Sequence, residues 1–286
     1  MDVISNISEA AAAPSSAPVQ SSAAAKFPAL ERMSPITLGE MDSIKLMNRV
    51  DTKYVTTERM LALVLDRAAA DGYRVLVTQT GRMCPYSTLY YDTPDLAMYT
   101  AHLNGVLRRR KVRTRTYLSS GQTFLEVKRK DNHGRTRKKR MEIPVGAMED
   151  FANVPDADAF LRKRSGYGVE ELQPRLYTIF RRITLVNPAM TERLTIDTAL
   201  EFVNLATGEK AGLGDAVIIE LKQDGLCPSP MKDILLDLRV KPFRVSKYCV
   251  GTVMTDPDVR KARFKMKVRY IEKITGCPLQ GGMRRN

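Results

Sequence analysis

Residues 104–142 concentrate positive charge on segments that alternate like β-strands, and this constrains the fold more than any other feature. The segment holds fourteen Lys/Arg and three Asp/Glu, which is 14 − 3 = +11 of the chain's net charge of +14. Side chains along a strand alternate between the two faces of a sheet, so Lys111, Arg113 and Arg115 share one face. Val112 lies between them on the other face. The pattern predicts a sheet with one charged and one apolar face.

Two further segments repeat this alternation. Glu126 and Lys128 share a face, with Val127 between them, and Glu220 and Lys222 flank another apolar residue. A charged face can point to water or into a barrel. Acidic residues among so many bases favour the barrel, because they would pair with the bases or hold a divalent metal beside bound phosphates. We therefore expect an α+β fold, an antiparallel β-barrel tunnel with helices packed outside, and a solvated sheet face is the alternative.

The chain divides into three parts by composition. Residues 1–33 are rich in Ala, Ser and Pro and are expected to be disordered. Residues 34–256 contain the strand-like segments and form the expected tunnel domain. Residues 257–286 form a basic C-terminal helix or tail, whose role as a lid, a membrane contact or a product tether stays open, with solvated disorder as the alternative.

The composition also limits the classes of molecule that could bind this chain. A pI of about 9.7 requires an anionic partner such as nucleic acid, a membrane surface or a phosphorylated molecule. The chain has no Trp and only 7% aromatic residues, whereas surfaces that bind single strands stack bases on aromatic side chains. We therefore expect no nucleic-acid partner.

The sequence shows no motif for a structural zinc site, no disulfide framework and no transmembrane segment. The four cysteines form no CxxC pair and lie apart from His102 and His133, which disfavours a structural zinc site. Nothing suggests a disulfide framework, so we expect a reducing, cytoplasmic location. No apolar run approaches the length of a transmembrane helix, so any recruitment to a membrane would need a partner.

Seven motifs follow one another along the chain: NRVDTKYV, YYDTPDLAMY, RTRTY, FLEVKRK, RLTIDTAL, IELK and FRVSKY. In this order they resemble the VTC (vacuolar transporter chaperone) polyphosphate polymerase domain, one of the triphosphate tunnel metalloenzymes. The resemblance covers about residues 36–255. It implies a tunnel in which the γ-phosphate of ATP is transferred to a growing inorganic polyphosphate chain, with Mn²⁺ or Mg²⁺. The alternatives are a triphosphatase and a module that binds polyphosphate or triphosphate without turnover.

The resemblance also implies roles for individual residues. The expected catalytic residues, which position and neutralise phosphates, are Lys53, Arg113, Arg115, Lys128, Arg182, Arg193 and Lys247. Further substrate-binding residues are Lys138, Arg140, Ser246 and Lys222, and Lys139 is an alternative to Lys138 because the hairpin length leaves strand parity open.

The same resemblance gives the metal and the partners. Glu220 matches the glutamate that binds the metal, and Glu126 either assists it or pairs with a neighbouring arginine. The expected partners are ATP and inorganic polyphosphate, and a membrane-protein partner is left open.

Overall fold

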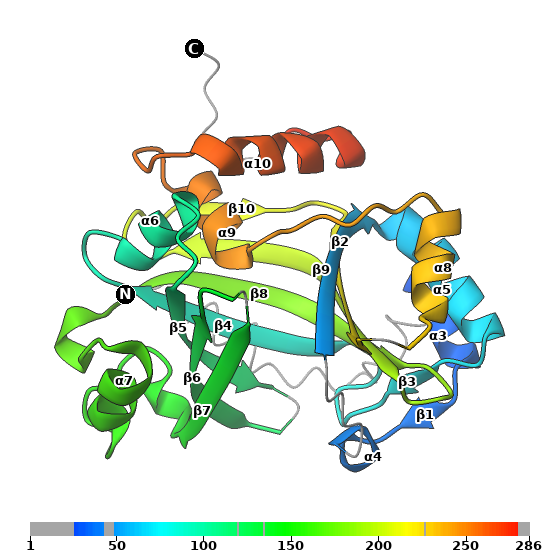
Figure 1. Ribbon diagram of the computed structural model, residues 1–286, viewed down its shortest axis with the longest axis horizontal. Helices are drawn as coiled ribbons and strands as arrows, with labels where there is room; N and C mark the ends of the chain where they lie inside the picture. Colours follow the sequence, from blue (N-terminus) through cyan, green and yellow to red (C-terminus); the bar gives the residue numbers. More distant parts are fainter. Residues whose placement is uncertain (1–25, 43–48, 119, 134, 226, 280–286) are drawn as a thin grey trace, which may run out of the picture.

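The structure, a computed structural model, describes residues 26–42, 49–118, 120–133, 135–225 and 227–279. Its centre is a curled antiparallel sheet with the strand order β2-β11-β9-β8-β4-β5-β6-β7 (Figure 1). These strands are β2 (Arg49–Thr57), β4 (Cys84–Asp92), β5 (Arg109–Tyr117), β6 (Gln122–Lys130), β7 (Thr136–Ile143), β8 (Gln173–Val186), β9 (Glu192–Asn204) and β11 (Ala216–Asp224). Three short strands, β1 (Pro35–Ile36), β3 (Arg74–Leu76) and β10 (Lys210–Gly212), add to its margins.

The curl makes a half-barrel. Strands β2 and β7 end the main path, and within the described ranges they do not pair with each other. The expectation of an antiparallel tunnel-type sheet surrounded by helices is confirmed.

Helices lie around the sheet in three groups. In Figure 1, α3, α5 and α8 lie on one side, α7 on the opposite side, and α6, α9 and α10 together along a third. Their bounds are α3 (Ala29–Arg32), α4 (Leu38–Asp42), α5 (Glu58–Ala70), α6 (Ala97–Leu103), α7 (Ala157–Ser165), α8 (Pro230–Asp237), α9 (Lys247–Thr255) and α10 (Ala262–Thr275). Two 3₁₀ turns, Val145–Ala147 and Val169–Glu171, flank α7.

Helix α5 shows why the outer face of the sheet is covered. The Thr57 side chain caps it by accepting from the Met60 amide. Its buried residues recur at helical spacing, so one stripe faces the sheet. This stripe, Leu61, Val64, Leu65 and Ala68, packs in a cluster with the outward residues of β8, β9 and β11.

A bulge in β9 lets apolar and polar residues share the inner face. Between the pairs Ile179–Glu201 and Arg181–Thr198, β8 advances two residues and β9 advances three. The extra residue reverses which alternate positions point inward, and Ala199 there has a φ of 48°. Leu200 therefore packs inside beneath α9, whereas Ile196, which has the same parity, packs outside beneath α5.

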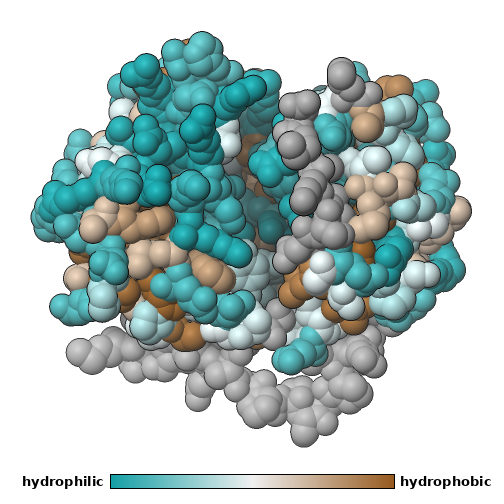
Figure 2. All heavy atoms as spheres, turned by 60° about the horizontal axis from the view of Figure 1, so that its bottom comes forward, coloured by the Kyte–Doolittle hydropathy of each residue, from teal (hydrophilic) through white to brown (hydrophobic). Residues whose placement is uncertain are grey.

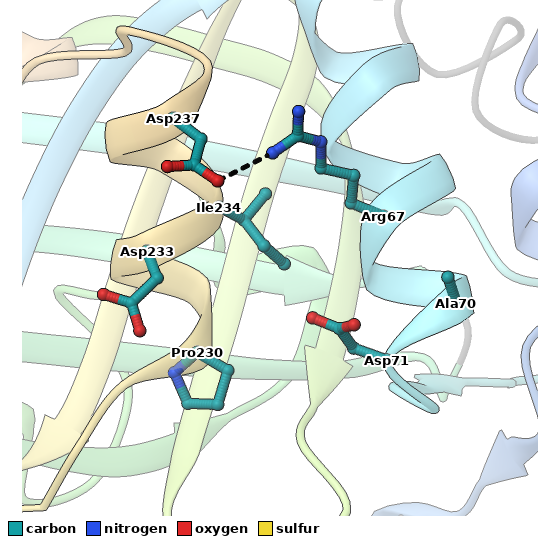
Figure 3. Close-up of a pocket in the computed structure, with 7 residues that line it drawn as sticks. All are labelled: Arg67, Ala70, Asp71, Pro230, Asp233, Ile234 and Asp237. Atoms are coloured by element: carbon teal, nitrogen blue, oxygen red, sulfur yellow. Dashed lines mark hydrogen bonds and ion pairs between the residues drawn. The ribbon is translucent and has the colours of Figure 1, made fainter.

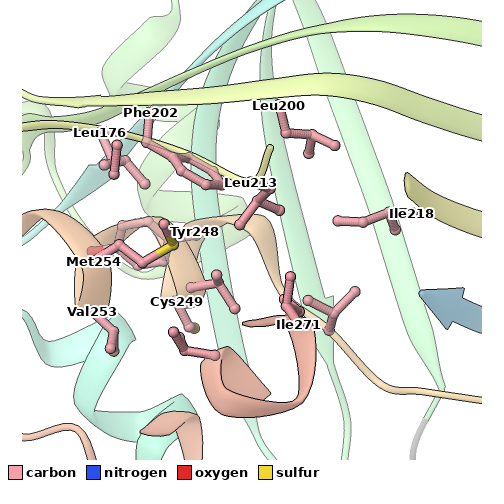
Figure 4. Packing of buried hydrophobic residues seen from close by; sticks show 14 of the residues in the cluster. Leu176, Leu200, Phe202, Leu213, Ile218, Tyr248, Cys249, Val253, Met254 and Ile271 are labelled. Atoms are coloured by element: carbon pink, nitrogen blue, oxygen red, sulfur yellow. The ribbon is translucent and has the colours of Figure 1, made fainter. Parts of the chain in front are cut away.

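Helix α9 fills one end of the half-barrel. It packs against inward residues of β8 and β9, including Leu176 and Phe202 (Figure 4). The buried carboxylate of Asp92, at the end of β4, accepts from the Tyr248 hydroxyl in α9 at 2.5 Å and from the backbone amides of Met98 and Tyr99 in α6. Asp92 thus joins both helices to the sheet.

The two ends of the described chain are both folded against this core. Residues 26–33 were expected to be disordered, but they include α3, and Phe27 and Leu30 are fully buried because they fill the cluster beneath α5. The same expectation for 1–25 lies outside the described residues. Within the basic segment, Ala262–Thr275 form helix α10, whose Phe264 and Val268 pack beside α9.

Candidate functional site

A row of three lysines crosses the inner face of the sheet. Lys111 on β5 pairs in register with Lys128 on β6, which pairs with Lys138 on β7. Like charges directly opposite on neighbouring strands destabilise a sheet unless something compensates them. The register also answers the question of parity: Lys138 shares the inner face with Lys128, and Lys139 lies opposite Val127 on the outer face.

The next inner row is neutralised by a buried carboxylate. Glu126 accepts two bonds from Arg113, at 2.8 and 2.6 Å, and one from Lys138 at 2.8 Å. Burial opposes ionisation of Glu126, but the charges of Arg113, Arg115 and Lys138 outweigh it and hold its pKa well below the usual range. Arg140, the third member of the row, is exposed and lies 4.3 Å from the centre of the Phe124 ring.

A second buried carboxylate, Asp197 on β9, holds two more of the expected residues. Arg182 binds both of its oxygens, at 2.6 and 2.9 Å, and Lys247 donates to Oδ2. Burial opposes the charge of Asp197, and the two cations reverse this effect, so its pKa is held low. The pKa of Lys247 falls to about 8, chiefly because it is buried.

A third carboxylate, Glu220 on β11, repeats the arrangement. Lys53 on β2 donates to Oε1 at 2.7 Å, and Lys222 lies 3.1 Å from Oε2. Burial again opposes ionisation, and the charges of Lys222, Lys53 and Lys128 lower the pKa of Glu220 well below its ordinary value. Arg193 pairs in register with Lys222, which brings it to the same inner wall.

These walls face one another across the half-barrel. Lys128 lies on β6, and four strands separate β6 from β11 along the sheet. The pKa of Lys128 is nevertheless well below its ordinary value because of Arg113, burial, and the charges of Arg115 and Lys53, while Glu220 acts in the opposite direction. Such effects require the charges to converge on a common interior.

Arg115 extends the site along β5. It is 6% exposed and donates to the Thr88 hydroxyl at 3.1 Å. Burial and the charges of Arg113 and Arg182 lower its pKa, which shows that the local cations repel one another. Such a cluster is suited to an anionic ligand that would relieve the repulsion.

The first turn of α9 completes the site. The Ser246 hydroxyl caps the helix by accepting from the Cys249 amide and also accepts from Lys111 Nζ at 2.8 Å. Lys247 follows, with Nζ 4.6 Å from the centre of the Phe180 ring. A helix N-terminus adds partial positive charge to a site that already holds several cations.

The structure thus brings the expected basic residues together. It also adds to the site three residues that the resemblance did not single out: Asp197, Lys111 and Tyr90. Asp197 stands in the RLTIDTAL motif and shares a strand face with Arg193, which could have revealed it. Lys111 continues the alternation of Arg113 and Arg115. Tyr90 is buried and accepts from Arg113 at 3.2 Å; burial opposes ionisation, but nearby cations lower its pKa to about 8.

The two glutamates differ in their fitness to bind a metal. Glu126 is fully buried and engaged by Arg113 and Lys138, so it does not fit a metal ligand. Glu220 keeps 20% side-chain exposure, and one carboxylate with substrate phosphates is a common Mg²⁺ arrangement. Among the residues that the structure describes, no three His, Cys, Asp or Glu side chains group as a metal site.

The shape of the molecular surface is consistent with a binding site inside the half-barrel. Figure 2 shows one face hollowed between two lobes, with hydrophilic side chains within the hollow. A separate pocket between α5 and α8 is lined by Arg67, Asp71, Asp233 and Asp237, with Arg67 bonded to Asp237 (Figure 3). Its aspartates would repel phosphates, so the basic interior is the better candidate site.

Fold and site together define a half-barrel protein with a basic interior suited to an anionic ligand. The VTC domain family matches residues 48–256, and the chain belongs to this family. No curated protein matches the chain significantly. No helix within the described ranges is long and apolar enough to cross a membrane.

Solved structures resemble the chain only distantly. A candidate adenylate cyclase of Vibrio parahaemolyticus has a TM-score of 0.42 and 11% identity, covering 71% of this chain and 96% of that one. One from Bacillus halodurans has a TM-score of 0.45 and 12% identity, covering 70% and 96%. A candidate adenylyl cyclase of Hippeastrum, with a reported dominant triphosphatase activity, has a TM-score of 0.44 and 14% identity, covering 72% and 95%. Likeness at this level carries no argument about function.

Proposed function

We propose that this protein is a metal-dependent polyphosphate polymerase that transfers the γ-phosphate of ATP to a growing inorganic polyphosphate chain inside the basic half-barrel. The observation that carries the proposal is that the inner face of the curled sheet bears cations from β2, at one end of the strand order, to β7 at the other, including Lys53, Lys128 and Lys138. The lowered pKa of Lys128 agrees with this crowding of positive charge. Membership of the VTC domain family supports it. The proposal includes a cytoplasmic location, where ATP is available, and recruitment to a membrane by a partner protein.

The chain's own residues would bind and orient the phosphates. Phosphoryl transfer depends on positioning and on neutralising charge, and it needs no covalent side chain. Arginines can bind two phosphate oxygens at once, whereas lysines act as point charges. The proposed phosphate ligands are Lys53, Arg113, Arg115, Lys128, Arg182, Arg193 and Lys247, with Lys111, Lys138, Arg140, Lys222 and Ser246 around them.

Glu220 is the proposed metal ligand. A bound Mn²⁺ or Mg²⁺ would supply charge that stabilises phosphate oxygens. Lys53 and Lys222 now occupy both Glu220 oxygens, so phosphates entering the site would have to draw these lysines away. Glu126 is assigned to positioning Arg113.

The direct test is synthesis by the purified full chain. Incubation with ATP and Mn²⁺ should yield polyphosphate chains on a gel. If no divalent metal supports either chain synthesis or phosphate release, an enzymatic function is contradicted. Phosphate release without chains would instead identify a triphosphatase.

The Glu220→Gln variant tests whether Glu220 binds the metal, because the substitution removes the carboxylate charge and keeps the size of the side chain. The variant should bind Mn²⁺ at least tenfold more weakly in the presence of tripolyphosphate, because one carboxylate ligand is lost. Calorimetry measures this directly, and Glu209→Gln, an exposed residue, is the matched control. Unchanged Mn²⁺ affinity in the Glu220 variant would refute its role as a metal ligand.

A binding module without turnover is the second candidate. It is favoured by the ion pairs that engage all three interior carboxylates, Glu126, Asp197 and Glu220. This reading predicts tight, salt-sensitive binding of polyphosphate and no release of phosphate from ATP. Duplex DNA should displace little or no bound polyphosphate in competition, since we expect no nucleic-acid partner.

A further inference from the structure

Three arginines lie side by side on the outer face of the sheet, opposite to the proposed tunnel. Arg110 on β5 pairs in register with Arg129 on β6, which pairs with Arg137 on β7. Each has the opposite parity to the inner lysines, so the row points away from the half-barrel. Like charges placed directly opposite one another weaken a sheet, so this row needs an explanation outside the tunnel.

Within the part of the chain that the structure describes, no carboxylate neutralises these arginines. All three are exposed, and within the described ranges none forms an ion pair with a carboxylate. Arg110 rests near the Tyr167 ring, with Cζ 5.9 Å from its centre, just after α7 ends. Lys139, the outward residue two positions after Arg137, is likewise exposed and without an ion pair there. We call Arg110, Arg129, Arg137 and Lys139 the outer basic row.

The neighbouring outward positions behave differently. Val112 and Val127 pair in register and are fully buried in the cluster that contains Leu161 of α7. Helix α7 therefore covers the apolar part of this face and stops short of the arginines. The outer basic row is thus a separate charged strip at the margin of a face that is otherwise packed.

The edge strand β7 connects the two basic surfaces. Its consecutive residues Lys138 and Lys139 point to the inner and the outer face, and within the described ranges no strand pairs with its free side. Figure 1 shows β7 at the open margin of the curled sheet. An anionic chain leaving the interior over β7 would pass directly from inner to outer cations.

We propose that the outer basic row binds the part of a long polyphosphate chain that extends beyond the half-barrel, with β7 as the edge over which it passes. The inference rests on the proposed function for the identity of the ligand. Neighbouring strands lie about 4.8 Å apart, so three arginines span only about 10 Å, a narrow line suited to a thin linear polyanion. Guanidinium groups also bind phosphate oxygens in pairs.

The test compares a short and a long ligand on the full chain. On the proposed function, tripolyphosphate would bind within the interior, whereas long-chain polyphosphate would extend outside it. In the triple variant Arg129→Gln/Arg137→Gln/Lys139→Gln, affinity for long-chain polyphosphate should fall about tenfold, equivalent to about 1.4 kcal/mol. Affinity for tripolyphosphate should not change. The matched control, Lys265→Gln/Arg269→Gln/Lys273→Gln, removes the same charge from the exposed face of α10 and should alter neither affinity.

Each outcome decides the matter. A selective loss of long-chain affinity supports the outer row, even if the synthesis assay yields no chains. Unchanged long-chain affinity, or an equal loss for both ligands, overturns it regardless of that assay. In a parallel arm, vesicles containing phosphatidylserine replace polyphosphate. If the triple variant loses only vesicle binding, the row contacts an anionic membrane and the proposal is wrong.

Discussion

At the scale of single residues, Asp197 is the buried anion that allows Arg182 and Lys247 to lie close together. Its side chain is 4% exposed and engages both cations. Asp197→Asn should lower the free energy of unfolding by about 3–5 kcal/mol, because two buried cations lose their shared partner. Urea unfolding measures this, and tripolyphosphate should recover part of the loss.

The matched control for Asp197 is Glu201→Gln on the same strand. Glu201 is exposed, so its substitution should change stability by less than about 0.5 kcal/mol. An equally small effect at Asp197 would mean that the two cations do not depend on it.

Lys247 and Tyr90 give the site a pH dependence. Both have a pKa of about 8, below their ordinary values, so on raising the pH Lys247 loses its positive charge and Tyr90 becomes an anion. Both changes weaken phosphate binding, and tripolyphosphate affinity should fall above about pH 8. Calorimetry at a series of pH values tests this, and Lys247→Met should flatten the profile.

Stability should respond in the opposite sense to binding. Between about pH 8 and the ordinary pKa values of lysine and tyrosine near 10, the unfolded chain binds more protons than the folded one. The contribution of these two groups to the free energy of unfolding therefore rises with pH in that window. Urea unfolding at a series of pH values measures this contribution. If both the tripolyphosphate affinity and the contribution of Lys247 and Tyr90 to the free energy of unfolding fell as the pH rose, these groups would not have the lowered pKa values described.

At the scale of elements, α9 depends on a glycine for its close approach to the sheet. A Cβ on Gly251 would lie 2.6 Å from side-chain atoms of both Leu176 and Phe202. Gly251→Ala should therefore destabilise the fold by about 1–3 kcal/mol through overpacking. It should also weaken tripolyphosphate binding, because Ser246 and Lys247 begin this helix.

Gly39→Ala is the control for that substitution. Gly39 lies in α4, and no heavy atom lies within 4 Å of its added Cβ, so alanine should be neutral or slightly stabilising in thermal unfolding. A similar loss at both glycines would place the effect in the helices themselves and not in the contact between α9 and the sheet.

Sequence alternation predicted some elements better than others. On β5 and β6, strict period-two alternation identified the inner face, because neither strand contains a bulge in their pairing. On β9 it could not, since the extra residue near Ala199 reverses parity within one strand. Lys138 could be separated from Lys139 only by the register of the β6–β7 hairpin.

Other features depended on tertiary contacts that no local pattern encodes. The segment after Lys26 has a disorder-prone composition, yet Phe27 and Leu30 are buried because α5 and the sheet offer an apolar surface. The resemblance implied phosphate-binding roles for Arg182 and Lys247, and strand parity with Arg193 could have revealed Asp197 as an inward residue. That Asp197 joins Arg182 to Lys247 became evident only when β8, β9 and α9 were placed together.

At the scale of the whole molecule, charges from distant strands converge on one interior, and Lys128 responds to this most clearly. Repulsion from Arg113, together with burial, lowers its pKa well below the ordinary value, and no carboxylate within the described ranges forms an ion pair with it. Lys128→Gln should therefore stabilise the protein without ligand, because a repelled cation is removed. The same change should weaken phosphate binding.

The decisive measurement is tripolyphosphate affinity by calorimetry for Lys128→Gln and for Arg181→Gln, an exposed arginine on β8. Lys128→Gln should bind at least about tenfold more weakly while unfolding at a higher temperature, and Arg181→Gln should match the unsubstituted protein. Equal affinity of all three proteins would contradict a phosphate site inside the half-barrel.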